Sequence, residues 1–181
     1  EKLSKLEKET EITTVGIDVD SIGLSTINLM GKEIKPRSAV DLMEVLNDYS
    51  FNYIIKGIMT IDEAKKAAKA GFDGVFVSNH GGRVLDHTPG VAEVLPKIAK
   101  EIGDEVTVLA DGGIRNGVDV LKMLALGANA VMIGRPVAIA AFSDLEKGVA
   151  NYFANLQKEL ATAMLLTGCK DISKINSKII Y

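Results

Sequence analysis

Short apolar runs rich in Val and Ile alternate with stretches of helical pattern along most of this 181-residue chain. Continuous apolar runs of this length are typical of parallel strands that are covered on both faces. Because strand and helix alternate regularly, the pattern predicts right-handed parallel βα units and therefore an α/β fold. The predicted strands cover residues 13–19, 52–58, 74–79, 105–111 and 129–134.

Capping residues mark the helices between these strands. Thr60 is followed by Glu63 at the capping-box position, and Gly71 provides the stop. Residues 1–12 look like the end of a helix that enters a strand, and residues 28–38 form the most irregular connection. The predicted helices cover residues 37–48, 60–71, 88–103, 117–128 and 145–167.

The number of strands bears on which α/β architecture is present. An open doubly wound sheet and a closed (β/α)₈ barrel are both built from such units. Five strands are too few to close a barrel of about 250 residues. A chain that began in the middle of a barrel would start as this one does. No linker or second domain is visible, so we expect residues 1–181 to form a single domain piece.

Composition excludes several classes of function. The chain is 47% hydrophobic and 25% charged, which is typical of a folded globular protein rather than a disordered one. A net charge of −3 gives no general attraction to nucleic acid or an anionic membrane. No uncharged stretch reaches the about 20 residues of a membrane span. The single cysteine, Cys169, excludes an internal disulfide, and the charged first residues show no secretory leader, so we expect a cytoplasmic protein.

Polar residues stand at the carboxyl ends of all five predicted strands, where parallel α/β proteins place their active groups. Surface solvation alone does not explain five such ends in succession. The sequence therefore predicts a functional site at this edge. The residues concerned are Asp18 and Asp20, then Lys56, then the segments SNHGGR (78–83), ADGGIR (110–115) and GRP (134–136).

The segments ADGGIR and GRP together predict a phosphate site. Glycines let backbone amides approach an anion closely, and Arg115 and Arg135 add charge-assisted hydrogen bonds. Loops after the last two strands of a barrel often bind phosphate. The alternative is a pair of tight βα turns with exposed arginines.

His80 leads from an apolar strand into a double glycine, with Arg83 three residues further on. A histidine here can act as a general base near neutral pH, and the arginine can clamp a carboxylate with two parallel bonds. A histidine at a strand end can also be structural, but the two glycines favour close approach of a ligand. His87 precedes a predicted helix, and we interpret it as a turn or capping residue.

Lys56 lies in an otherwise apolar strand, where an unpaired ammonium would be costly. It therefore faces a polar cavity or an anion, unless it snorkels out at the strand end. Asp18 and Asp20 share a face if the strand continues, and one of them could orient His80 and stabilise its protonated form. The alternative for these carboxylates is a turn or helix cap. We expect no metal site.

Taken together, the segments IIKGI, VSNHGGR, LADGGIR and VMIGRP resemble the FMN-dependent α-hydroxy-acid dehydrogenases and oxidases, the family of glycolate oxidase, lactate oxidase and flavocytochrome b2. The resemblance runs from about residue 15 to residue 172. It implies a (β/α)₈ TIM barrel, of which this chain covers roughly strands 4 to 8. It also implies FMN as cofactor and the oxidation of a small 2-hydroxy acid, of the lactate or glycolate type, to the 2-oxo acid.

The resemblance also implies a role for each matched residue. His80 corresponds to the base that takes a proton from the hydroxy acid, and Arg83 to the arginine that binds the substrate carboxylate. Lys56 corresponds to a catalytic lysine beside the flavin, and Asp18 to the carboxylate that bonds to the catalytic histidine. Further contacts to FMN are implied for Ser78, Asp111, Gly113, Arg115, Gly134 and Arg135.

Two departures from the family pattern leave alternatives open. Gly16 stands where the family often has a threonine that touches the flavin, and the family's first three strands have no counterpart here. We therefore expect the N-terminal half of a barrel, or further copies of the chain, as a partner. One alternative is a non-catalytic half-barrel that binds a phosphate ligand. Another is an enzyme similar to IMP dehydrogenase, although Cys169 is badly placed for the cysteine nucleophile of that chemistry.

Overall fold

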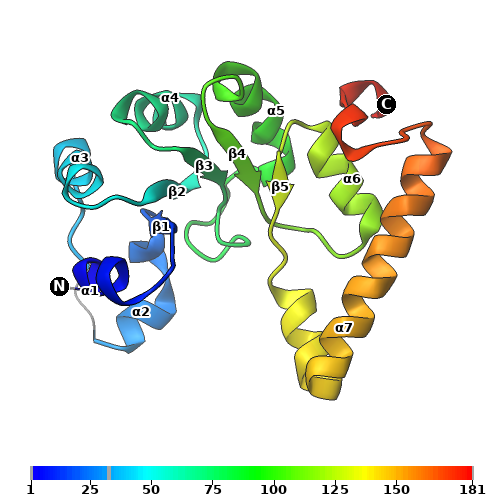
Figure 1. The fold of residues 1–181 in the computed structure, drawn as a ribbon, viewed down its shortest axis with the longest axis horizontal. Helices are drawn as coiled ribbons and strands as arrows, with labels where there is room; N and C mark the ends of the chain where they lie inside the picture. Colours follow the sequence, from blue (N-terminus) through cyan, green and yellow to red (C-terminus); the bar gives the residue numbers. More distant parts are fainter. Residues whose placement is uncertain (1, 32–33, 181) are drawn as a thin grey trace.

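A parallel sheet forms the centre of the molecule (Figure 1). The computed structural model describes residues 2–31 and 34–180. Within them, the sheet orders its five strands as they follow in the chain. A doubly wound sheet reverses its strand order, whereas a barrel adds each strand beside the last. The order therefore favours consecutive units of a barrel. The strands are β1 (Thr14–Asp18), β2 (Asn52–Ile58), β3 (Gly74–Val77), β4 (Thr107–Ala110) and β5 (Ala130–Val131).

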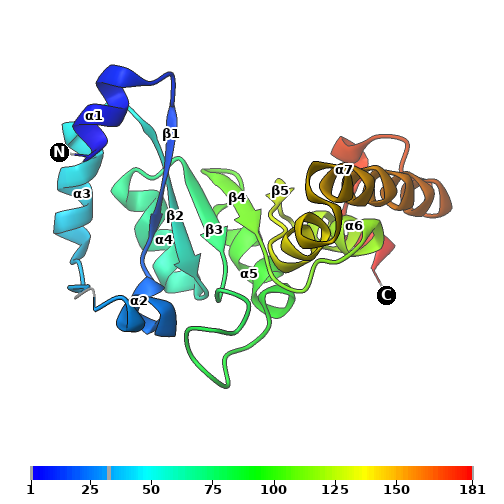
Figure 2. The same ribbon diagram turned by 90° about the horizontal axis from the view of Figure 1, so that it is seen from below.

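Helices connect these strands, and Figures 1 and 2 show α4 and α5 on the same face of the sheet. Covering on one face is what the outer ring of a barrel requires. No described helix is long and apolar enough to cross a membrane. The helices are α1 (Lys2–Glu9), α2 (Ser25–Leu29), α3 (Ala39–Asp48), α4 (Ile61–Ala70), α5 (Val91–Ile102), α6 (Gly117–Ala125) and α7 (Arg135–Leu166), with 3₁₀-helices η1 (Ser21–Gly23), η2 (Ile172–Lys174) and η3 (Ser177–Ile179).

The caps of α4 confirm the predicted start and end of that helix. The Thr60 hydroxyl accepts a hydrogen bond from the Glu63 N–H at 3.2 Å, and the Glu63 carboxylate accepts one from the Thr60 N–H at 3.1 Å. Gly71 ends the helix at a φ of 96°, a left-handed conformation that glycine adopts at little cost. Local side-chain chemistry thus fixes both ends of α4.

The core lies between β3, β4 and the helices that cover them. All four residues of β3 are buried, and the side chains of Val75 and Val77 are completely enclosed. Leu95 and Ile98 of α5 are equally buried in the same cluster. Full burial of such a side chain contributes about 1.5–3 kcal/mol. The loop that follows β3 therefore starts from a firmly held strand.

The structure corrects several predicted boundaries. The strands expected over 74–79, 105–111 and 129–134 are shorter, because pairing stops where the chain turns into the polar loops. The irregular connection expected at 28–38 begins inside α2, and residues 32–33 lie outside the described part.

The last helix begins earlier than predicted. It was expected over 145–167, but α7 starts at Arg135 and is interrupted by non-helical backbone at Asp144 and Leu145. Pro136 lies in the first turn, a position that suits proline because its ring fixes a helical φ and no N–H is needed there. This proline is the sequence feature that indicates the early start.

Candidate active site

Four charged or titratable side chains meet at the carboxyl ends of the first three strands. Asp18 is the last residue of β1, and it pairs in register with Lys56 of β2. Asp20 follows two residues later, before η1, and His80 lies three residues beyond β3. The Val19 N–H donates to the Lys56 carbonyl at 2.9 Å, which carries the strand pairing past the end of β1. The parallel sheet thus brings residues far apart in sequence to one edge.

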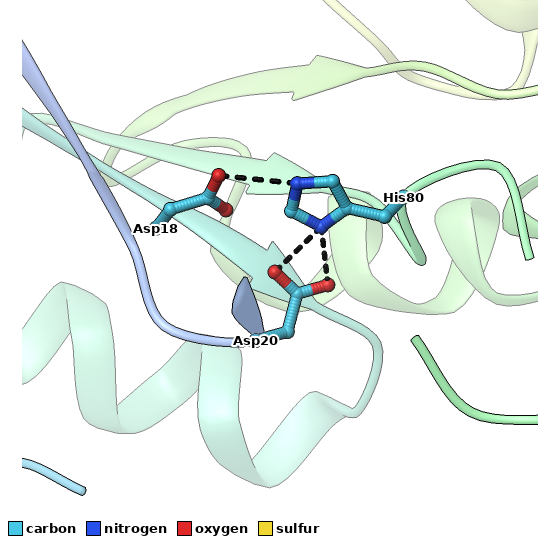
Figure 3. A group of neighbouring side chains, drawn as sticks. All are labelled: Asp18, Asp20 and His80. Carbon is cyan, nitrogen blue, oxygen red and sulfur yellow. Dashed lines mark hydrogen bonds and ion pairs between the residues drawn. The ribbon is translucent and has the colours of Figure 1, made fainter. Parts of the chain in front are cut away.

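Carboxylates lie on both nitrogens of the His80 imidazole (Figure 3). Nδ1 lies 2.8 Å from each carboxylate oxygen of Asp20. Nε2 lies 3.1 Å from Oδ2 of Asp18. The His80 side chain is only 11% exposed. The contacts with the two carboxylates therefore hold the imidazole in one orientation.

Lys56 supplies the positive charge of this cluster. Its Nζ lies 3.3 Å from Nε2 of His80, 3.5 Å from Oδ1 of Asp18 and 4.0 Å from Oδ2 of Asp111. It also lies 5.8 Å from the centre of the Phe76 ring. The strand-end lysine thus faces anions.

Asp18, Asp20 and His80 also offer three potential metal-ligand atoms within 4.8 Å of one another. The ammonium of Lys56 already lies against Nε2 and beside Asp18, where it balances the carboxylate charge. A second cation at this point would be repelled by it. The geometry therefore favours an ion-paired network over a metal centre.

Ser78 and Asp111 form a second, connected contact. The Ser78 hydroxyl is fully buried, donates to Oδ2 of Asp111 at 2.8 Å, and accepts the His80 N–H at 3.2 Å. The other oxygen of Asp111, Oδ1, is buried and has no hydrogen-bond partner among the described residues. A buried carboxylate oxygen normally has one. Oδ1 is thus available to a ligand that brings a donor.

Burial raises the pKa values of two carboxyls in the cluster. For Asp18 the cause is desolvation, opposed by the positive charges of Lys56 and His80. For Asp111 it is again desolvation, opposed by the hydrogen bond from Ser78 and the charge of Lys56. The ionised forms of both groups are therefore less favourable in the folded protein than in water.

The raised pKa of Asp111 predicts a pH-dependent gain in stability for Asp111→Asn. Above the ordinary value of 3.8, the folded protein still holds a proton that the unfolded chain has released. The free energy of unfolding therefore falls as pH rises from 3.8 to the folded pKa. Asparagine does not titrate, so the free energy of unfolding of the variant does not fall in this way. The stability of the variant relative to wild type should therefore increase as the pH rises from 3.8 to the folded pKa. Urea unfolding at a series of pH values measures the difference; a difference independent of pH would contradict the prediction.

The loop after β3 is shaped by three left-handed residues in succession. His80, Gly81 and Gly82 have φ values of 54°, 67° and 79°. A Cβ on Gly81 would lie 2.8 Å from Nη2 of Arg135, which itself lies 3.5 Å from the Gly81 carbonyl oxygen. Arg83 donates from Nε to the His80 carbonyl at 3.0 Å. The other nitrogens of its guanidinium make no hydrogen bond within the described residues and can meet an anion.

The two predicted phosphate loops are held by their backbones and leave their arginines exposed. The Arg115 N–H donates to Asp119 of α6 at 3.1 Å, and the Arg115 carbonyl accepts from the Tyr152 hydroxyl of α7 at 3.0 Å. Open space surrounds Gly113 and Gly134, since a Cβ on either would meet nothing within 4 Å. Backbone of this kind can approach a ligand closely.

The structure brings most of the predicted site residues together, but Gly113, Arg115 and Gly134 make no hydrogen bond or ion pair with the network around His80 in the described part of the chain. Two residues that were not predicted to act in the site also lie outside it. His87 lies apart as an exposed loop residue with a φ of 62°, and Cys169 is a buried free thiol. Asp20 has no role implied by the resemblance, although its spacing of two residues from Asp18 indicated a shared face. One connected network contains Asp18, Asp20, Lys56, Ser78, His80 and Asp111, and the loop contacts add Arg83 and Arg135.

Comparisons with known proteins agree with this arrangement. A family described as FMN-dependent dehydrogenase matches residues 6–181. An L-lactate dehydrogenase of Caulobacter vibrioides is 47% identical over 140 residues, which are 77% of this chain and 37% of the relative. The 2-hydroxyacid oxidase 1 of Mus musculus is 44% identical over 131 residues, 72% of this chain and 35% of the relative. A mandelate oxidase variant solved with (S)-mandelic acid superposes with a TM-score of 0.87 at 30% identity, covering 97% of this chain and 57% of that one.

The chain belongs to the FMN-dependent dehydrogenase family. It matches the C-terminal part of its relatives, and its α/β sheet is part of a TIM barrel of their kind. The predicted family and fold class are thereby confirmed. The chain spans a little over a third of the length of the curated relatives that it matches.

Proposed function

We propose that this chain forms the C-terminal, catalytic part of an enzyme that uses FMN to oxidise a small 2-hydroxy acid, of the lactate or glycolate type, to the 2-oxo acid. The observation that carries this proposal is the largely enclosed His80 imidazole, held between two carboxylates and a lysine. Arg83 follows in the same loop. A base beside a carboxylate clamp is what an α-hydroxy acid needs. The names of the relatives, L-lactate dehydrogenase and 2-hydroxyacid oxidase, point to the same substrate class.

The residues present fit FMN. The buried Oδ1 of Asp111 lacks a partner, which suits a hydroxyl of the ribityl chain. The exposed backbone at Gly113 and Gly134 and the N-terminus of α7 suit the phosphate, because helix N-termini attract anions. Ser78 and Lys56 lie next to Asp111. The predicted contacts from Arg115 and Arg135 complete this set.

In this proposal FMN, when bound, supplies the acceptor for the two electrons of the oxidation. Each side chain then has one task. His80 takes the hydroxyl proton of the substrate at Nε2, and the adjacent carboxylates stabilise the imidazolium that results. Arg83 binds the substrate carboxylate. Lys56 keeps positive charge beside the reacting groups.

The proposal is tested by the colour of the protein. Protein purified together with the N-terminal half of its barrel should show flavin absorbance that is bleached anaerobically by lactate or glycolate, and a simple carboxylic acid without the hydroxyl serves as control. Bound flavin that neither acid reduces would favour the non-catalytic binding alternative. Protein that takes up no FMN would reject the proposal.

Replacing Arg83 by lysine should raise KM and lower kcat for hydroxy acids. Lysine keeps the charge but cannot form two parallel bonds to a carboxylate. It also loses the Nε bond to the His80 carbonyl, which orients the guanidinium. Steady-state kinetics measure the change, and an unchanged kcat/KM would remove Arg83 from the substrate site.

We also propose that further strands pair with the two edges of this sheet. Within the described residues, β1 and β5 each pair on one side only. Unpaired strand edges attract other strands. The N-terminal half of the barrel is the expected partner, since the relatives are more than twice as long as this chain's match. Association with further copies, a cytoplasmic location and the absence of nucleic-acid binding remain predictions.

A further inference from the structure

We infer that Asp20, and not Asp18, is the carboxylate that orients the imidazole of His80; this inference rests on the proposed function. The two carboxylates lie on opposite sides of the ring (Figure 3). Asp20 faces Nδ1 with both oxygens at 2.8 Å, whereas Asp18 faces Nε2 with one oxygen at 3.1 Å. The Asp20 side chain is 16% exposed and that of Asp18 is 39% exposed. Asp20 is therefore the closer and more enclosed partner.

The two ring nitrogens of His80 differ in the hydrogen-bond donors and acceptors that face them. A neutral imidazole carries one N–H, on either Nδ1 or Nε2. Nε2 has two neighbours with opposite demands, because Asp18 can only accept and the ammonium of Lys56 can only donate. Nδ1 has one neighbour among the described residues, the acceptor Asp20. In the neutral ring, a proton on Nδ1 that is donated to Asp20 leaves the lone pair of Nε2 to accept from Lys56. In the imidazolium, Nδ1 still donates to Asp20 while Nε2 donates to Asp18.

The backbone of β2 is shaped around the Asp20 carboxylate. The register between β2 and β3 shifts by one residue between Lys56 and Ile58, which places Gly57 in a bulge with a φ of 100°. A Cβ on Gly57 would lie 2.5 Å from Cγ of Asp20. The bulge therefore provides the space that this carboxylate fills.

Asp18 has a different task in this arrangement. It occupies the side of Nε2, the nitrogen that must present a free lone pair to the substrate hydroxyl. The hydroxyl has to take the place at Nε2 that Asp18 and Lys56 hold in the structure. Asp20 is therefore the positioning residue, and Asp18 and Lys56 control access to the base.

The ring nitrogens of His80 report this arrangement directly. The chain has two histidines, so a His87→Gln variant assigns the resonances of each ring. We expect two-bond ¹H–¹⁵N spectra of the FMN-loaded protein to show neutral His80 protonated on Nδ1. Asp18→Asn should leave the proton there. Asp20→Asn, whose amide can donate to Nδ1, should move it to Nε2. A wild-type ring protonated on Nε2 would overturn the inference without any variant.

Kinetics give an independent measurement. Asp20→Asn is nearly isosteric and should keep its FMN, yet kcat/KM for the hydroxy acid should fall about 100-fold or more, because a wrongly placed proton disables the base. A near wild-type kcat/KM in Asp20→Asn would overturn the inference while leaving the proposed function intact. If wild-type protein oxidised no hydroxy acid, the proposed function would fail, and the nitrogen spectra would still decide whether Asp20 or Asp18 fixes the ring.

Discussion

His80→Gln should retain FMN and lose turnover of hydroxy acids by about 10²–10⁴-fold, the usual effect of removing a general base. The physical reason is that the tasks are separated in space. His80 lies in the carboxylate and lysine network, whereas the exposed glycines 113 and 134 and their arginines lie in other loops. The measurement is kcat together with the ratio of flavin to protein in the purified variant.

The chain contains its own control for this variant. His87→Gln makes the same chemical change at an exposed loop residue outside the network, and it should leave turnover at the wild-type level. Equal losses in the two variants would point to a general effect on the loop. Near wild-type turnover in His80→Gln would reject His80 as the base.

Lys56→Met should lower the free energy of unfolding by about 2–3 kcal/mol, somewhat less than the loss of one partner from a fully buried ion pair. Methionine fills much of the space of the lysine stem but leaves Asp18 and Asp111 without their counter-charge. Lys56 and Asp111 are each only 15% exposed, so water screens this loss poorly. Asp18 is 39% exposed and contributes less. Urea unfolding at neutral pH measures the change.

A double variant distinguishes charge from packing. If the uncompensated carboxylates cause the loss, Asp111→Asn should raise the free energy of unfolding of Lys56→Met by more than it raises that of wild type. If the loss came instead from the contact of the lysine with the Phe76 ring, Asp111→Asn would raise the stability of Lys56→Met and of wild type by the same amount.

Local chemistry made much of the fold predictable. The strand expected over 52–58 is found at those residues, because β1 pairs with its first five residues and the pairing with β3 continues to Ile58. The capping box at Thr60 and the glycine at 71 set the ends of α4 within a few residues of chain. The strand β5 is shorter than expected because, in the part of the chain that the structure describes, it has one neighbouring strand and pairs through Ala130 and Val131 alone. The apolar pattern of a sequence indicates which residues are buried, whereas the length of a strand also depends on how far the neighbouring strand extends beside it.

The site was predictable in its membership but not in its geometry. Strand-end position indicated that Lys56 and His80 would meet, since the carboxyl ends of parallel strands share one edge. The division of the ring nitrogens between Asp18 and Asp20 depends on the bulge at Gly57, a register shift between two strands. The contact of Arg135 with the Gly81 carbonyl depends on how two loops from different units approach each other. Neither the bulge nor the contact between the two loops could be predicted from the residue types around it.

The bulge at Gly57 also has an evolutionary consequence. Because any Cβ at position 57 would overlap the carboxylate at position 20, the two positions cannot vary independently. A descendant of this chain that acquires a side chain at 57 must first, or simultaneously, give up the acid at 20. Loss of the acid at 20 can come first, since a smaller residue there leaves the glycine at 57 undisturbed. Selection for Asp20 would therefore appear in a lineage as an invariant glycine 37 positions further along the chain.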